Sequence, residues 1–172
     1  TDRAVIEREL SELVGKKSTC EKRDKLIVVG TQVLEQSLDI DFDYMITELC
    51  PMDLLLQRSG RLHRHNRTRP DKLSEPELCV LIPEDFSKSV YSGWILKQTK
   101  KYLPDKLVIP GCIPELVGAV YSEPDNDEQL TTEYREYSDE QKEKKQRAKK
   151  YCIPSQKINR SDSTLSDMIN RR

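Results

Sequence analysis

Two arginines, a glutamine and a glycine recur at helical spacing between positions 57 and 64. If this segment is a helix, positions i, i+3, i+4 and i+7 share one face, which carries Gln57, Gly60, Arg61 and Arg64. Arginine stays charged and donates hydrogen bonds in a fixed fork that suits phosphate oxygens, and glycine leaves room for close approach. The pattern indicates a surface for a phosphorylated ligand; a solvated basic face is the alternative.

A second polar segment, residues 31–41, directly follows an apolar run at 25–30. Ligands of open α/β sheets bind at the C-terminal ends of parallel strands. Thr31 and Ser37 can contact a phosphate backbone there, and Asp39 can accept from a ribose hydroxyl or orient an arginine. Taken alone, this loop could equally be a turn with a helix cap. The two segments together favour a functional site.

These residues carry a family resemblance. Residues 31–40 resemble motif V of superfamily 2 helicases, and residues 57–64 resemble their motif VI. The wording of residues 31–43, 51–58 and 60–65 is similar to the helicase–nuclease of type I CRISPR–Cas systems. The similarity is dense over residues 25–70 and weaker around Asp2-Arg3 and at 113–121; from Pro124 onward only composition is informative.

The resemblance implies that ATP and Mg²⁺ bind between two RecA-like domains of a longer protein. Arg61 and Arg64 would face the triphosphate as arginine fingers, each a group worth about 10³–10⁵ in rate. The remaining implied contacts are to ATP at Gln57, Gly60 and Asp39, and to nucleic acid at Thr31, Gln32 and Ser37. The resemblance also implies 3′-to-5′ movement on single-stranded DNA, DNA degradation by a separate nuclease domain, and recruitment by a CRISPR surveillance complex.

Several motifs of such enzymes do not occur in these 172 residues. There is no Gly-x-x-x-x-Gly-Lys-Ser/Thr phosphate loop, no Asp-Glu-x-His or Asp-Glu-Ala-Asp magnesium motif, and no paired His-Asp nuclease site. The only histidines, His63 and His65, have no acidic or cysteine partner close by in sequence, so we predict no metal site. We expect the chain alone to bind no cofactor, hydrolyse no ATP and cut no DNA.

Periodicity and breaker residues predict the elements that position these motifs. Helices are expected at 4–14, 53–64, 87–102 and 113–121, and short apolar strands at 25–30, 44–49 and 78–82. The first of these strands should be buried on both faces, as in a parallel sheet. An acidic loop at 123–136 should precede a basic helix that begins at a Ser138 capping pattern and runs to 150.

The element order predicts an α/β fold: a partial RecA-like helicase C-terminal domain with a parallel sheet flanked by helices, plus a mostly helical C-terminal extension. We assign residues 1–83 to the later part of a second RecA-like domain. Residues 84–122 form a helical connector, and 123–172 a charged extension that is helical or partly disordered.

Composition narrows the class of protein. A net charge of -1 predicts no polyanion partner by itself, and 34% charged residues against 35% hydrophobic ones indicate solvated or incomplete parts. The five cysteines are scattered, which favours reduced thiols in the cytoplasm, and no apolar run approaches the ~20 residues of a membrane span. The chain starts at Thr1 without Met, which we interpret as a processing or cloning boundary.

Three alternatives remain open. The parent could be another superfamily 2 helicase that acts on DNA or RNA, the extension from Pro83 onward could dock a protein partner, or the chain could bind nucleic acid on its own. Two basic stretches bear on the last alternative. The first contains Arg64, Arg67, Arg69 and Lys72, which either touch nucleic acid or the triphosphate or form a solvated turn. The second is the lysine-rich helix at 142–150, which either meets DNA or is a solvated face.

Overall fold

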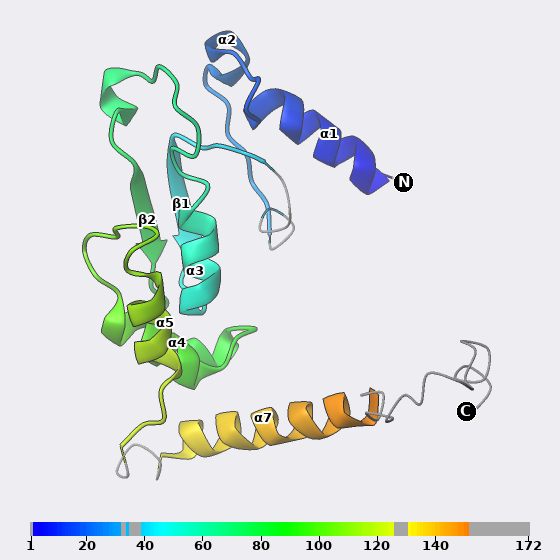
Figure 1. Ribbon diagram of the computed structural model, residues 1–172, viewed down its shortest axis with the longest axis vertical. Helices are drawn as coiled ribbons and strands as arrows, with labels where there is room; N and C mark the ends of the chain where they lie inside the picture. The colour runs from blue at the N-terminus through cyan, green and yellow to red at the C-terminus, as the bar shows by residue number, and fades with distance from the viewer. Residues whose placement is uncertain (1, 32–33, 35–38, 126–130, 152–172) are drawn as a thin grey trace, which may run out of the picture. The chain divides into compact units, whose positions relative to one another are not determined.

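The fold is α/β and is centred on a two-stranded parallel sheet. The computed structural model describes residues 2–31, 34, 39–125 and 131–151 (Figure 1). Strand β1 (Tyr44–Glu48) pairs with β2 (Glu77–Leu81), with Tyr44 opposite Glu77 and Glu48 opposite Leu81. Helix α3 (Met52–Ser59) lies in the connection between them, as a parallel pair requires. The predicted α/β class and the strands expected at 44–49 and 78–82 are confirmed.

Among the described residues, the further helices are α1 (Asp2–Val14), α2 (Cys20–Arg23), α4 (Gly93–Tyr102), α5 (Ile113–Tyr121) and α7 (Thr132–Tyr151), and short 3₁₀ helices include η2 (Asp71–Leu73) and η3 (Phe86–Lys88). The helices expected at 4–14 and 113–121 are therefore confirmed. Within the described ranges, every helix is too short or too polar to cross a lipid bilayer.

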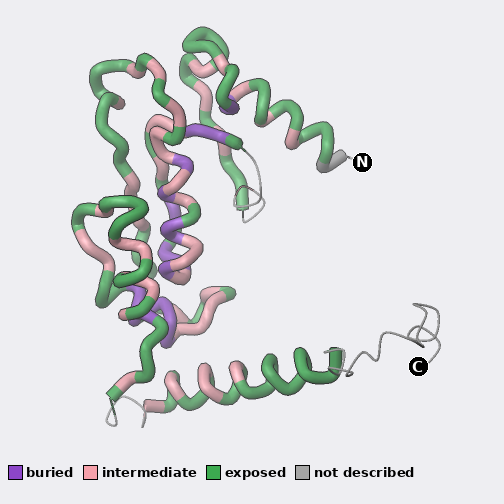
Figure 2. Tube along the Cα trace, viewed as in Figure 1, coloured by how far each residue is buried: buried purple, intermediate pink, exposed green. Residues whose placement is uncertain are grey.

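The core lies between α3, α4 and α5 (Figure 2). Helix α3 buries Met52, Leu55 and Leu56, and α4 and α5 bury Leu96 and Val120. A hydrogen bond of 2.6 Å from the Tyr121 hydroxyl to the Asp53 carboxylate also links α5 to α3. Helix α3 is therefore held rigidly by its apolar face, and the residues after its C-terminus start from a fixed point.

The chain divides into two compact units, Thr1–Tyr134 and Arg135–Arg172. The start of α7 belongs to the first unit, where the rings of Tyr134 and Trp94 meet edge to face at 5.1 Å and Lys97 pairs with Glu133 at 2.6 Å. The described residues of α7 include no buried one. The expected division into 1–83, 84–122 and 123–172 stays a prediction.

The strand expected at 25–30 is wrong. These residues form no strand, and Ile27 and Val29 are 85% and 92% exposed. A strand exists only where a neighbour accepts and donates its backbone hydrogen bonds, and within the described part of the chain β1 pairs only with β2. The apolar run predicts burial, but burial on both faces needs neighbouring segments, and no described segment covers Ile27 and Val29.

The helix expected at 53–64 is wrong at its C-terminal end, because α3 stops at Ser59. The next residues instead pair with the segment before β1. The amide of Phe42 donates to the carbonyl of Arg61 at 2.8 Å, and the amide of His63 donates to the carbonyl of Phe42 at 3.0 Å. His63 adopts a φ of 48°, outside the helical region. Pairing with an extended segment has overridden the helical pattern.

The expected helix at 87–102 begins only at Gly93. Before Gly93, side chains accept hydrogen bonds from the backbone. The amide of Ser87 donates to the carboxylate of Asp85 at 2.8 Å, and the amide of Tyr91 donates to the hydroxyl of Ser89 at 3.2 Å. Such local bonds compete with helix formation. The backbone bond from Ser87 also holds the pKa of Asp85 below its ordinary value.

The acidic loop expected at 123–136 is wrong over residues 132–136, and the helix start expected at Ser138 is wrong as well. Helix α7 begins at Thr132, six positions earlier, and the hydroxyl of Thr131 accepts from the amide of Tyr134 at 3.3 Å. The contact of Tyr134 with Trp94 gives the first turn a packing partner, which composition could not reveal. Residues 152–172, the end of the extension expected to be helical or partly disordered, lie outside the described part of the chain.

Candidate functional site

Three aspartates before β1, at positions 39, 41 and 43, face a set of basic residues that follow α3. In extended backbone, alternate residues point to the same side, so Asp39, Asp41 and Asp43 form one row. Ile40, between them, is fully buried on the other side. We call these three side chains the aspartate row; together with its basic partners it forms the centre of the site.

Asp41 is the most enclosed member of the aspartate row, with 0% of its surface exposed. Its Oδ1 accepts from the backbone amide of Arg64 at 2.8 Å and from Nη2 of Arg69 at 2.9 Å. Its Oδ2 lies 2.6 Å from Nε of Arg67 and 2.9 Å from Nη2 of Arg69. A buried carboxylate is tolerated only when charges and donors compensate it, and here two guanidinium groups and an amide do so.

Asp43 extends this network on the side nearest β1. Its carboxylate pairs with Arg69 and with Arg23 of α2, the latter at 2.8 Å. Arg23 also donates to the carbonyl of Asp41 at 2.8 Å, and Arg67 donates to the carbonyls of Gly15 and Ser18 at 3.1 and 3.3 Å. The network therefore fastens α1 and α2 to the segment that follows α3.

Asp39 lies at the exposed end of the aspartate row. Its Oδ1 accepts from Nε of Arg64 at 2.8 Å and lies 3.0 Å from Nε2 of His65. The Arg64 side chain remains 43% exposed. Arg64 thus combines a backbone fixed by Asp41 with a charged group held at the surface, which suits contact with an external anion.

The four residues expected on one helical face are distributed differently. Gln57 lies on α3 and is exposed, Gly60 caps its C-terminus, and Arg61 and Arg64 follow outside the helix. Arg61 is only 9% exposed, and its Nη1 donates to the carbonyl of Gln57 at 2.8 Å. That bond satisfies a carbonyl of the last helical turn. The prediction of a shared helical face is therefore wrong, because the helix ends at Ser59, before Arg61 and Arg64.

Gly60 has ordinary backbone angles, with φ of -64°. A Cβ atom added there would meet only the carbonyl oxygens of Gln57 and Leu56, both at 3.5 Å, which is normal contact. Neither backbone conformation nor packing among the described residues therefore requires glycine at this position. The expected contact of Gly60 with ATP stays a prediction.

The nucleic-acid contacts predicted at Thr31, Gln32 and Ser37 fall mostly on residues that the structure does not describe. Gln32 and Ser37 lie outside the described residues. Thr31 is exposed, and its carbonyl accepts from the amide of Leu34 at 3.0 Å. The assignment of all three to nucleic acid stays a prediction.

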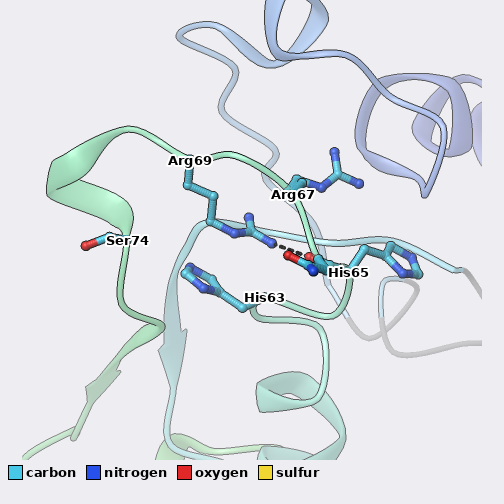
Figure 3. Close-up of a pocket in the computed structure, with 6 residues that line it drawn as sticks. His63, His65, Arg67, Arg69 and Ser74 are labelled. Atoms are coloured by element: carbon cyan, nitrogen blue, oxygen red, sulfur yellow. Dashed lines mark hydrogen bonds between the residues drawn. The ribbon is translucent and has the colours of Figure 1, made fainter.

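An open hollow of about 450 Å³ lies beside the network (Figure 3). It is lined by His63, His65, Asn66, Arg67, Arg69 and Ser74. Nη2 of Arg69 donates to the carbonyl of His65 at 3.1 Å, the bond drawn in Figure 3. None of the four residues of the predicted helical face lines this hollow, so it is separate from the surface that they were expected to form.

Sequence reasoning missed the part played by Arg67 and Arg69. A solvated turn or a phosphate contact was expected, yet their side chains are 12% and 6% exposed and bind Asp41. The signal was present: Asp39, Asp41 and Asp43 alternate, and so do Arg67 and Arg69, as pairing side chains of two extended segments do. His65 also has an acidic partner after all, Asp39, which is close in space and distant in sequence.

Among the described residues, no three histidine, cysteine, aspartate or glutamate side chains are grouped closely enough to hold a metal ion. Asp39 and Asp41 are instead occupied by cationic side chains.

Comparison with known proteins identifies the family. Residues 1–67 match the family model described as "CRISPR-associated nuclease/helicase Cas3, C-terminal". This range contains α1, β1, α3, the aspartate row and Arg64.

The relatives extend the match to nearly the whole chain. A CRISPR-associated nuclease/helicase Cas3 of Streptococcus thermophilus is 38% identical over 98% of this chain and 20% of its own length. A CRISPR-associated endonuclease/helicase Cas3 of Thermus thermophilus is 45% identical over 65% of this chain and 13% of its own length.

A solved structure described as T. fusca Cas3-ATP has a TM-score of 0.74 and 33% identity, and the match covers 89% of this chain and 19% of that one. The chain spans about a fifth of the length of the first of these relatives. The resemblance carried by residues 31–43 and 57–65 is confirmed, and the chain belongs to the family of CRISPR-associated nuclease/helicase Cas3 proteins.

Proposed function

We propose that this chain acts within a longer protein as the arginine-bearing side of an ATP site in a single-stranded DNA translocase of type I CRISPR immunity. The observation that carries the proposal is Arg64, which is fixed at its backbone and exposed at its guanidinium. Such a group can stabilise the charge that develops on a transferred phosphoryl group. In this proposal, another domain of the longer protein carries the nuclease, the protein acts in the cytoplasm, and a CRISPR surveillance complex recruits it.

The two arginines receive different roles in this proposal. Arg64 reaches the triphosphate, because its side chain stands at the surface and is oriented through Nε by Asp39. Arg61 supports the end of α3 through its bond to the Gln57 carbonyl, which leaves it a positioning role. The exposed side chain of Gln57 and the open space at Gly60 provide room for the nucleotide beside this helix end.

The residues present fit ATP on one side only. Arg64, Gln57 and Gly60 offer a cation, an amide and free space, whereas a phosphate loop and an Asp-Glu-x-His or Asp-Glu-Ala-Asp magnesium motif do not occur in these 172 residues. A second domain would supply the magnesium-binding motif and the phosphate loop. Hydrolysis would then depend on closure of the two domains, which couples turnover to movement along a strand.

The test is ATP turnover by the complete protein that carries this sequence, measured with Mg²⁺ and with single-stranded DNA, single-stranded RNA or no nucleic acid. We expect DNA to raise the turnover, and a streptavidin-displacement assay to show movement towards the 5′ end. Stimulation by RNA alone would favour the alternative of an RNA-directed superfamily 2 helicase. Turnover that responds to neither nucleic acid would contradict the translocase.

Gly60→Ala should separate function from stability. Alanine fits the local backbone and packing, so the free energy of unfolding should stay equal or rise by about 0.4–1 kcal/mol. DNA-stimulated turnover should nevertheless fall, because the new methyl group occupies space that the nucleotide approaches. The matched control is Gly118→Ala in α5, where an added Cβ meets nothing within 4 Å. Equal turnover of both variants and wild type would contradict the assignment of Gly60.

A second candidate function, docking of a protein partner, is favoured by the absence of buried residues along the described part of α7. Deletion from residue 83 cannot test it cleanly, since it would remove Leu96 and Val120 from the core. Ending the complete protein after Tyr134, at the boundary of the first compact unit, is the better test. We expect ATP turnover to survive this truncation within about threefold, since surface segments away from a core contribute little to its stability.

The readout for docking is binding of the truncated protein to the CRISPR surveillance complex on target DNA. Loss of binding with retained turnover would assign docking to the part of the protein from residue 135 onward. Unchanged binding would exclude these residues from the interface and leave the ATP-site proposal as it stands.

A further inference from the structure

Asp41 joins elements that are far apart in the sequence. Its carboxylate receives Arg67, Arg69 and the backbone amide of Arg64, while its own amide donates to the carbonyl of Val14 at 2.9 Å. With 0% exposure, it has no water to replace any of these donors. Loss of the negative charge of Asp41 would therefore weaken its bonds to Arg67, Arg69 and the Arg64 amide together.

The backbone of Arg64 is held on both sides by these bonds. On the preceding side, the amide of His63 donates to the carbonyl of Phe42, the residue next to Asp41. On the following side, Arg67 is bound to Asp41 and to the carbonyls of Gly15 and Ser18. These bonds fix the path of the backbone from His63 to Arg67 across the aspartate row, so the Cα position of Arg64 is fixed as well.

The charged end of Arg64 is held more loosely than its backbone. One oxygen of Asp39, a residue about half exposed, accepts from Nε. A side chain with a fixed backbone and an exposed charged group is pre-organised for binding, because internal contacts do not occupy all of its hydrogen-bond donors. The buried carboxylate of Asp41 fixes the backbone of Arg64, and Asp39 orients only its guanidinium group.

We propose that Asp41 is a positioning residue for Arg64: by bonding the Arg64 amide and clamping Arg67 and Arg69, it sets where the Arg64 guanidinium stands when the ATP site closes. This inference rests on the proposed function. It assigns no contact between Asp41 and the nucleotide, since the carboxylate is buried beneath the arginines. Its effect on turnover must pass through Arg64.

The experiment is a double-mutant cycle in the complete protein, with DNA-stimulated ATP turnover at saturating and limiting ATP as the readout. Asp41→Asn keeps the shape and one acceptor oxygen but removes the charge. We expect it to lower kcat about 10- to 100-fold with KM for ATP changed less than about threefold, because an interaction made in the transition state is lost. Added to Arg64→Ala, the same change should cost less than about twofold.

Asp43→Asn is the matched comparison. Asp43 shares Arg69 with Asp41 and also pairs with Arg23, but its carboxylate makes no bond to Arg64 in the structure. It should reduce the melting temperature as Asp41→Asn does but lower kcat less than about tenfold, because the bond from the Arg64 amide to Asp41 stays in place. If Asp41→Asn does not fold, Arg67→Lys replaces it in the cycle, since lysine keeps the charge and loses the fork that spans Asp41, Gly15 and Ser18.

Each outcome decides between the two ideas. Independent, multiplicative losses from Asp41→Asn and Arg64→Ala would overturn the inference, as would equal losses of kcat in Asp41→Asn and Asp43→Asn. Wild-type turnover in Asp41→Asn with impaired Arg64→Ala would overturn the inference and leave the proposed function standing. Wild-type turnover in Arg64→Ala would overturn the proposed function itself, and the inference with it.

Discussion

Replacing Arg64 by alanine should lower DNA-stimulated ATP turnover of the complete protein about a thousandfold, the lower end of what an arginine finger supplies. The guanidinium stands at the surface, where it can meet charge that grows on the phosphoryl oxygens during transfer. Because that charge is greatest in the transition state, kcat should fall far more than the affinity for a non-hydrolysable ATP analogue. Steady-state turnover and equilibrium binding of the analogue, measured on the same preparation, check both parts.

Two further variants sharpen this prediction. Arg64→Lys should recover only a small part of the loss, because an ammonium group cannot keep the Nε bond to Asp39 while presenting a fork to phosphate. Arg147→Ala is the control, since Arg147 is also an exposed arginine beside one carboxylate, Glu143. Turnover of Arg64→Ala within about threefold of the control would mean that Arg64 does not act on the transition state.

Replacing Asp41 by alanine should weaken the structure around the aspartate row by about 3–5 kcal/mol, the usual cost of leaving buried charges without their partner. Arg67 and Arg69 would both lose this carboxylate while their side chains remain 12% and 6% exposed. Native-state hydrogen exchange measures the effect locally. The amides of Phe42 and His63, which bond across this segment, should exchange about a hundredfold faster or more, since 1.4 kcal/mol corresponds to tenfold.

The control for this prediction is Asp139→Ala. Asp139 pairs with Lys142 on an exposed helix face at 2.8 Å, and an exposed pair contributes about 0.2–1 kcal/mol at most. Adding Arg69→Met to Asp41→Ala should recover part of the lost protection, since it removes one uncompensated buried charge. Unchanged exchange at Phe42 and His63 in Asp41→Ala would show that the aspartate row does not hold this segment.

Short-range patterns decided much of what could be predicted from the sequence. The apolar runs that became β1 and β2 and the helical stripes that became α1 and α5 specify their own structure, because side-chain periodicity follows from backbone geometry. The family was also determined by sequence, since the order of residues at 31–43 and 57–65 is specific enough to identify it. That result needs no coordinates.

Tertiary structure decided how the site is built. Residues 57–64 have a helical pattern, yet the segment leaves the helix at Ser59 because Arg61 and His63 pair with Phe42. The pairing brings together residues about 20 positions apart, and no local propensity can encode it. It also separated two arginines that were expected to act alike: Arg61 is buried and Arg64 lies at the surface.

The same reason explains the two largest errors. The run at 25–30 is apolar enough to be a central strand, but within the described residues it has no neighbour to pair with. Arg67 and Arg69 look like a solvated basic turn until Asp41 and Asp43 are placed beside them. Sequence specifies what each residue is able to do; which partner it meets, and therefore what it does, depends on contacts that only the folded chain creates.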